Sequence, residues 1–140
     1  MTAALGAGDV VTAAEAQARL DPVMDRARTT WPLDPKVVNL DGYQLKNAFM
    51  VKHWDAIQAG RAPPDPLLER AERRFFETLS IDPTDPEAVN GLGNILFFER
   101  DLDAAEFFHL AAIAAAHKRG IESYPAAEHD LELVRRYQRT

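Results

Sequence analysis

The sequence predicts an all-α fold, and three observations lead to this prediction. Apolar residues recur three, four and seven positions apart through most of the chain, which is the spacing of one face of a helix. Asp is followed by Pro at residues 34–35 and again at 85–86, where Asp can cap a helix and Pro suits its first position. No segment alternates apolar and polar residues in the manner typical of a strand.

The composition limits the classes of protein to which the chain can belong. It has 140 residues, 46% of them hydrophobic, which suits one domain with a sizeable core. A net charge of −6 argues against nucleic acid as a partner, because phosphate contacts need clustered Lys and Arg. Cys is absent, which excludes disulfides and zinc–thiolate sites. No apolar run has the length of a membrane helix or signal peptide, so we expect no membrane partner and a cytoplasmic location.

The N-terminal part is predicted to hold a mobile segment, residues 1–11, followed by a helical segment over residues 12–33. Thr12–Glu15 matches a capping box, in which the Thr side chain accepts from the backbone and the Glu side chain reaches back. Pro22 interrupts the helical segment, because Pro removes a backbone donor and clashes with the preceding turn. One kinked helix and two short helices, the second capped by Asp21, are both open at this point.

Four further helices are predicted between residues 34 and 120. The first begins at Asp34-Pro35 and runs to about Ala59, where Gly60 stops it. Gly120 is placed to end the last of them in a left-handed conformation, after cationic residues that suit the negative end of the helix dipole. The three helices after the first are expected over residues 66–80, 86–99 and 102–119.

A sixth helix is predicted near the C-terminus, with Ser123 as its capping residue and Pro125 in its first turn. Its inner stripe is formed by Ala127, Leu131 and Val134. The charged residues between them, Asp130 included, are expected to face water. A helix with one apolar stripe and a polar outer face is typical of the end of a stack of helices.

One pattern of residues occurs twice in the chain, 51 residues apart. Internal repetition at such a period indicates a repeat architecture. The first copy is Asp34-Pro35-x-x-Val38-Asn39-x-x-Gly42-x-x-Leu45, and the second is Asp85-Pro86-x-x-Val89-Asn90-x-x-Gly93-x-x-Leu96.

The second copy resembles a tetratricopeptide repeat. Its Val89-x-x-Leu92-Gly93-x-x-Leu96 is similar to the first-helix pattern of that family, and Ala105 and Ala112 follow at the family's spacing. The pattern Ala71-x-x-x-Phe75 resembles the family's second helix. The resemblance implies a tetratricopeptide-like stack of about six helices in antiparallel pairs, in a right-handed superhelical arrangement with a C-terminal capping helix.

The resemblance divides a single domain, residues 12–140, into parts. The family period is about 34 residues, so the 51-residue offset leaves a surplus of about 17, which we place near residues 51–66. Two positions depart from the family: His109 replaces a large aromatic residue, and Asp41 stands where the first copy should have Leu. The parts are the N-terminal helical segment 12–33, a stretched repeat 34–84, the best-matching repeat 85–120 and the capping helix 121–140.

No constellation of residues predicts catalysis, a cofactor or a metal site. The His residues lack the spacing of known zinc motifs. No Ser lies in a nucleophile-elbow context, and Gly42 and Gly93 lie within helix patterns instead of phosphate-binding loops. We therefore predict a non-enzymatic chain without cofactor or metal, in which His109 packs near the core through a ring hydrogen bond.

The resemblance implies a non-catalytic protein–protein interaction module, with a peptide or partner protein bound in a concave helical groove. Two sets of side chains, one in the helix that begins at Pro35 and one in the helix that begins at Pro86, are spaced by three, four and three residues. Each set therefore forms one stripe along its helix. Asn amides can pair with a peptide backbone, Lys can hold an acidic side chain or a C-terminal carboxylate, and aromatic rings can pack apolar groups. The alternative for the same residues is an ordinary solvated face. The predicted partner-binding residues are Lys36, Asn39, Tyr43, Lys46, Glu87, Asn90, Asn94 and Phe97.

Six of the seven Phe residues come in doublets, at residues 75–76, 97–98 and 107–108. Adjacent helix residues point about 100° apart, so one interface does not bury both rings of a doublet. Either neighbours on two sides bury them, or some rings are exposed at an interface. The second possibility supports an alternative function, a self-assembling homodimeric helical module with the doublets and Trp54 at its interface. An enzyme or small-ligand protein is the third alternative.

Overall fold

The computed structural model describes residues 22–23 and 25–139, and all regular secondary structure within them is helical. Residues 22–23 and 25–30 are helical, which leaves the two descriptions of this region open. The all-α prediction is confirmed. The predictions for residues 1–11, the Thr12–Glu15 capping box and the Asp21 cap lie outside the described residues. The longer helices are α2 (Pro35–Gln58), α3 (Pro66–Ile81), α4 (Pro86–Phe98), α5 (Leu102–Lys118) and α6 (Pro125–Gln138).

Asp-Pro pairs start three of these helices. The Asp34 carboxylate accepts a hydrogen bond from the Lys36 N–H at 2.8 Å, and the Asp85 carboxylate accepts one from the Ala88 N–H at 2.9 Å. Asp65 caps α3 in the same manner. Each carboxylate satisfies a donor that has no partner inside the first turn, and the Pro that follows lacks such a donor. The predicted start points are therefore confirmed.

The prediction that Ser123 caps α6 is wrong. The capping residue is Tyr124, whose side chain makes no capping bond. The Glu128 carboxylate takes over this role from inside the helix, because its Oε2 accepts from the Tyr124 N–H at 2.8 Å. A carboxylate in the first turn also suits the positive end of the helix dipole.

The surplus of the first repeat is mostly helical. Residues 51–58 continue α2, and residues 59–65 connect it to α3. A kink occurs at His53, whose φ of −123° and ψ of 23° are not helical. Its side chain lies 2.8 Å from Asp65 Oδ2, so the kinked residue is tied to the cap of α3.

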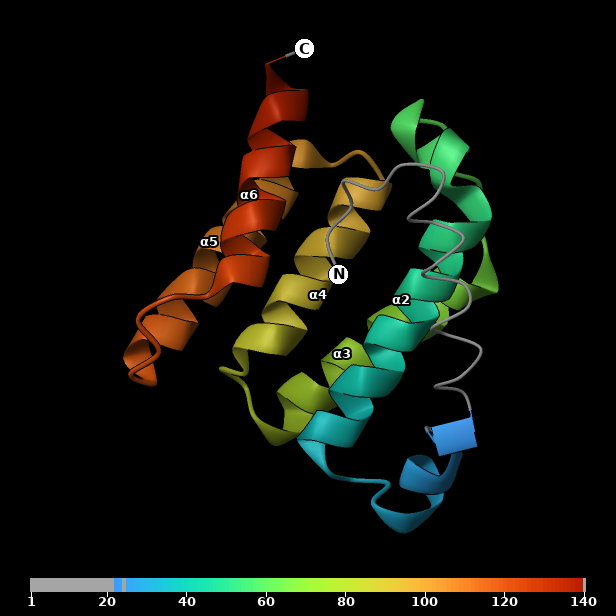
Figure 1. The fold of residues 1–140 in the computed structure, drawn as a ribbon, viewed down its shortest axis with the longest axis vertical. Coiled ribbons are helices and arrows are strands. Elements are labelled where there is room, and N and C mark those ends of the chain that lie inside the picture. The colour runs from blue at the N-terminus through green and yellow to red at the C-terminus, as the bar shows by residue number, and fades with distance from the viewer. Residues whose placement is uncertain (1–21, 24, 140) are drawn as a thin grey trace.

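The helices are arranged as neighbours in an array with α4 near its centre (Figure 1). Each helix from α2 to α6 packs against the next one along the chain. In addition, α2 contacts α4, and α4 contacts α6. This adjacency brings side chains of α2, α4 and α6 together, and these are the helices that carry the candidate site.

Glycine residues allow two rings to enter between the helices. An ideal Cβ on Gly42 would lie 2.9 Å from Phe75 Cε1, and one on Gly91 would lie 2.4 Å from Phe75 Cζ. The Phe75 ring therefore sits between α2 and α4 at distances that a Cβ would prevent. On Gly93, a Cβ would lie 2.7 Å from His109 Cε1. His109 of α5 therefore lies against α4 in a place similar to that of Phe75 of α3 against α2.

Candidate functional site

The structure places the eight predicted partner-binding residues at very different depths. Lys36 and Glu87 are exposed, and Tyr43 is partly buried. Lys46 is only 1% exposed, although it is a lysine predicted to line an open groove. A partner reaches the deep members of this set only if a covering group moves aside. The five buried members are Asn39, Lys46, Asn90, Asn94 and Phe97.

The two repeated Asn residues link alternate helices of the chain. Asn39 of α2 donates from its Nδ2 to the Asp85 carboxylate at the start of α4, at 3.0 Å. Asn90 of α4, its counterpart in the second copy, donates from its Nδ2 to the Asp130 carboxylate of α6, at 3.1 Å. In both copies the repeated Asn therefore binds a carboxylate of the helix after next, α4 for Asn39 and α6 for Asn90.

The Asp130 carboxylate lies at the centre of a buried polar cluster. The side chain was expected to face water, but it is 3% exposed, so that expectation is wrong. When the Asn94 amide is turned with its nitrogen toward Asp130, this nitrogen donates to Oδ2 at 3.0 Å and the amide oxygen accepts from Lys46 Nζ at 3.3 Å. This orientation satisfies both neighbours, so we adopt it.

Burial changes the proton affinity of the two charged residues in this cluster. Desolvation lowers the pKa of Lys46 to about 8, while the negative charge of Asp130 acts in the opposite direction. Desolvation also raises the pKa of Asp130, and Lys46 with the two Asn amides partly offsets this rise. A buried charge is tolerated when an opposite charge and hydrogen-bond partners surround it. Lys46 and Asp130 therefore depend on each other for their charged states.

His109 joins the cluster from α5. Its Nδ1 lies 2.6 Å from Asn90 Oδ1, and Asn90 Nδ2 already donates to Asp130. Nδ1 must therefore be the donor, which assigns the neutral ring the tautomer with its proton on Nδ1. Burial, followed by the positive charge of Lys46, lowers the His109 pKa to about 4. The predicted core position and ring hydrogen bond of His109 are confirmed.

The other predicted residues lie around this cluster. The Tyr43 hydroxyl donates to the Glu87 backbone carbonyl at 2.6 Å, and Lys46 Nζ lies 4.9 Å from the centre of the Tyr43 ring. The Phe97 ring belongs to an apolar cluster of the core and makes an edge contact with Tyr137 of α6, with centroids 5.2 Å apart. Phe97 is therefore covered by α6 and does not line an open groove.

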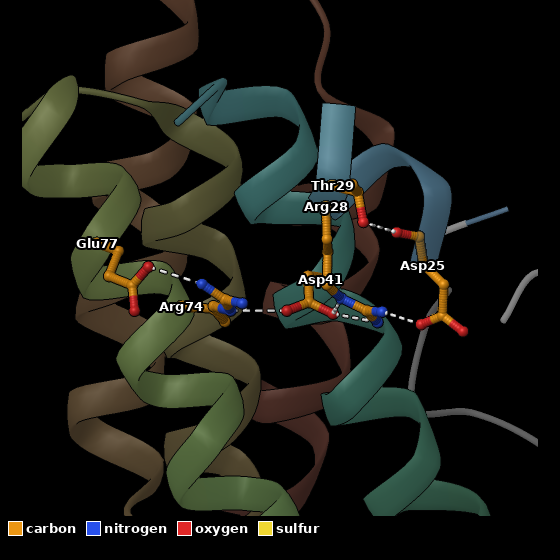
Figure 2. A network of polar contacts seen from close by, with 6 residues as sticks. All are labelled: Asp25, Arg28, Thr29, Asp41, Arg74 and Glu77. Atoms are coloured by element: carbon orange, nitrogen blue, oxygen red, sulfur yellow. Dashed lines mark hydrogen bonds and ion pairs between the residues drawn. The ribbon is translucent and has the colours of Figure 1, made fainter. Parts of the chain in front are cut away.

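A second polar cluster surrounds Asp41, which stands where the second copy of the repeat has Leu92 (Figure 2). The Asp41 side chain is 4% exposed and forms ion pairs with Arg28 and Arg74, each at 2.6 Å. Arg74 also pairs with Glu77 at 2.8 Å. Asp41 therefore ties the helical residues 25–30 to α2 through Arg28, and ties α2 to α3 through Arg74. The sequence signal was the Asp at a position that should be apolar, since such a residue needs partners when buried.

The Phe doublets are divided between core and surface. Phe75, Phe97 and Phe98 are buried, whereas Phe76 is 54% exposed and Phe107 is 68% exposed. Trp54 is 9% exposed and packs in the core, so it is not available to a dimer interface.

Among the described residues, no group of three His, Cys, Asp or Glu side chains is placed to hold a metal ion. The helices of the described part include none both long and apolar enough to cross a membrane. The chain matches no protein-family model, no curated protein and no solved structure. The chemistry of the clusters is therefore the basis for a functional proposal.

Proposed function

We propose that the chain is a non-catalytic interaction module built as a tetratricopeptide-like stack, and that its groove binds an acidic group of a partner protein or peptide. The observation that carries the proposal is the Asp130 carboxylate. Two Asn residues and a Lys that were predicted to line the groove surround a carboxylate supplied by the chain itself. Asp130 then stands in for the acidic group of a partner.

The order of helix contacts supports the stacked arrangement. In a tetratricopeptide-like stack, the second helix of one pair lies between the first helices of its own and the next pair. Phe75 of α3 lies against Gly42 of α2 and Gly91 of α4, and this position between two helices supports such a stack. In the same order, α6 follows α5 as the next first helix, since it contacts both α5 and α4.

The cluster has the chemistry of a carboxylate site. Asn90 and Asn94 both direct their amide nitrogens to Asp130 Oδ2, at 3.1 and 3.0 Å. The Lys46 ammonium supplies positive charge nearby. Hydrogen bonds to an ionised acceptor are stronger than those between neutral groups. An Asp or Glu side chain or a C-terminal carboxylate of a partner is suited to the same donors.

Binding at this site has to compete with α6. A partner carboxylate can enter only when Asp130 withdraws, and the apparent affinity is reduced by the fraction of chains in which the site is open. Weakening the hold on Asp130 should therefore strengthen the binding of an acidic partner. If Asp130 occupies a binding site, its removal strengthens the binding of an acidic partner. If the cluster only packs the helices together, the removal of Asp130 has no such effect.

The test uses peptides selected against the intact Asp130→Ala chain from a random library, with affinities measured by calorimetry. We expect the selected peptides to need an Asp, a Glu or a free C-terminus, and to bind wild type at least about tenfold more weakly than Asp130→Ala, a difference of about 1.4 kcal/mol. Adding Asn90→Ala and Asn94→Ala to the Asp130→Ala chain should remove about 1–3 kcal/mol of binding free energy.

Asn47→Ala is the matched control, because Asn47 lies on α2 beside Lys46 but is not among the residues that bind the Asp130 carboxylate. It should leave peptide affinity within about twofold, and circular dichroism should show that each variant stays folded. If the Asn90→Ala, Asn94→Ala variant stays folded and binds as before, the groove assignment is wrong. Equal affinity of wild type and Asp130→Ala would exclude competition by α6.

A further inference from the structure

One face of α5 is apolar and points away from the rest of the described fold. The buried stripe of this helix is Ala105, His109, Ala112 and Ala116. On the opposite side Phe107 is 68% exposed and Leu110 is 44% exposed. Phe107 and His109 are two residues apart and so point to nearly opposite sides of the helix, which separates this face from the polar cluster around Asp130.

The exposed positions of α5 form one continuous stripe. Their steps of four, three, four and three residues keep them on one side of a helix and match the seam of two packed helices. Among the described elements α5 packs against α4 and α6. Gln138 of α6 donates to Asp103 Oδ1 at 3.2 Å, but all five positions of the stripe remain exposed. The stripe consists of Asp103, Phe107, Leu110, Ala114 and His117.

The stripe is complementary to itself when reversed. Leu110 is its midpoint, seven residues from Asp103 and seven from His117. The acidic residue therefore lies at one end, and His117 with the exposed Lys118 lies at the other. The large Phe107 and the small Ala114 are on either side of the midpoint. A helix that is turned around thus offers charge opposite charge and a small side chain opposite a large one.

We propose that this face binds a second copy of the chain, with the two α5 helices antiparallel about a two-fold axis near Leu110. In this pairing Leu110 meets its counterpart. Phe107 lies opposite Ala114 of the other copy, to within about one residue of helix rise, 1.5 Å. Asp103 lies between His117 and Lys118 of the other copy. The contact is isologous and closed, so it ends at a dimer.

A parallel pairing of the same stripes is disfavoured, because it would place Asp103 against Asp103 and Lys118 against Lys118. The other exposed ring, Phe76 of α3, is 54% exposed but has the polar neighbours Glu72, Arg73 and Ser80 on its side of the helix. Phe76 therefore lacks a continuous apolar stripe and provides a matched control for Phe107.

The first experiment is sedimentation equilibrium of the full chain over a range of concentrations. Wild type should form a dimer with a dissociation constant of about 10–100 μM, as expected for an interface of small area. Phe107→Asp should raise the dimer dissociation constant about 100-fold or more, because it places a charge in the middle of the contact twice. Phe76→Asp should leave it unchanged. A monomeric wild type at the highest concentration, or a Phe107→Asp variant that dimerises like wild type, would overturn the proposal.

The second experiment tests the antiparallel arrangement with charge reversals. Asp103→Lys and Lys118→Asp should each weaken their own dimer about 3- to 10-fold, because each places like charges opposite one another. An equimolar mixture of the two variants should restore dimerisation, since each mixed dimer then contains two pairs of opposite charge. In a parallel dimer the single reversals would only exchange the sign of a like-charge contact. Single variants that dimerise as well as wild type would therefore refute the antiparallel arrangement.

Discussion

Gly93 occupies a position where even one methyl group should destabilise the fold. A Cβ added there would lie 2.7 Å from Cε1 and 2.8 Å from Nδ1 of His109. The ring has little freedom to retreat, because it is fully buried and its Nδ1 lies 2.6 Å from Asn90 Oδ1. Gly93→Ala must therefore either move the ring and stretch this hydrogen bond or separate α4 from α5.

The magnitude follows from two opposing effects. Overpacking a closely packed site costs about 1–3 kcal/mol, and a buried amide that loses its partner adds a cost of about 1–3 kcal/mol. Ala is a better helix former than Gly, which returns up to about 1 kcal/mol. The two costs add to about 2–6 kcal/mol, so the variant should be less stable by about 1–6 kcal/mol. Its melting temperature should fall by about 3–5 °C for each kcal/mol.

The assay is urea unfolding of a double-mutant cycle with His109→Ala. The smaller side chain leaves room for a Cβ on residue 93, so Gly93→Ala in the His109→Ala background should be neutral or stabilising by up to about 1 kcal/mol. The coupling energy between the two positions should then exceed about 1 kcal/mol. If Gly93→Ala destabilises both backgrounds equally, the Gly93–His109 contact is not the cause.

Two further predictions concern pH and the end of α5. The His109 pKa of about 4 in the folded chain is below its ordinary value of 6.5, so the unfolded state binds the proton first as pH falls. The contribution of neutral His109 to the free energy of unfolding is complete above pH 6.5 and is lost as pH falls to 4. Urea unfolding at several pH values should show that His109→Gln removes about 3 kcal/mol of this loss. If stability falls with pH equally steeply in wild type and variant, the prediction is wrong. Gly120 has a φ of 82°, and no other atom lies near the place of a Cβ. Gly120→Ala should therefore lower the free energy of unfolding by about 1 kcal/mol, and Gly120→Asn by less, because Asn tolerates this conformation. Equal melting temperatures of wild type and both variants would contradict this.

The boundaries of the helices could be predicted closely because they depend on local chemistry. A side-chain carboxylate that accepts from the first turn, followed by Pro, determines the start of α2, α3 and α4 within a few residues of sequence. The left-handed Gly120 likewise marks the end of α5. Ser123 failed as a cap because another local partner, Glu128, satisfies the same region of backbone.

The burial of the candidate site could not be predicted in the same manner. Periodicity shows that Asn90 and Asn94 lie on one stripe of a helix, but not which distant element covers that stripe. The cover includes Asp130, 40 residues beyond Asn90, and a single Asp in an amphipathic helix looks like a solvated residue. The repeated Asn carried the useful signal, since a polar residue at a fixed place in both copies has a partner at a fixed place too.

Asp41 provides a test of how one departure from the repeat affects the fold. The second copy has Leu92 at the corresponding position, which is buried in the core. Removing one partner of a buried ion pair is destabilising when the charge left behind stays buried, so the outcome depends on whether the remaining partners can reach water. The Arg28 and Arg74 side chains are 34% and 32% exposed, so both guanidinium groups can turn to water after the change.

Asp41→Leu should therefore change the free energy of unfolding by less than about 1 kcal/mol while releasing the helical residues 25–30, which Arg28 ties to α2. Trypsin should then cleave after Arg26 and Arg28 faster than in wild type, at an unchanged melting temperature. Asp41→Asn is the matched control, because it keeps the shape and a polar group but removes the charge. If Asp41→Leu lowers the melting temperature strongly, the ion pairs contribute to the stability of the whole domain. Cleavage after Arg26 and Arg28 that is no faster than in wild type would show that Asp41 does not anchor the first helical segment.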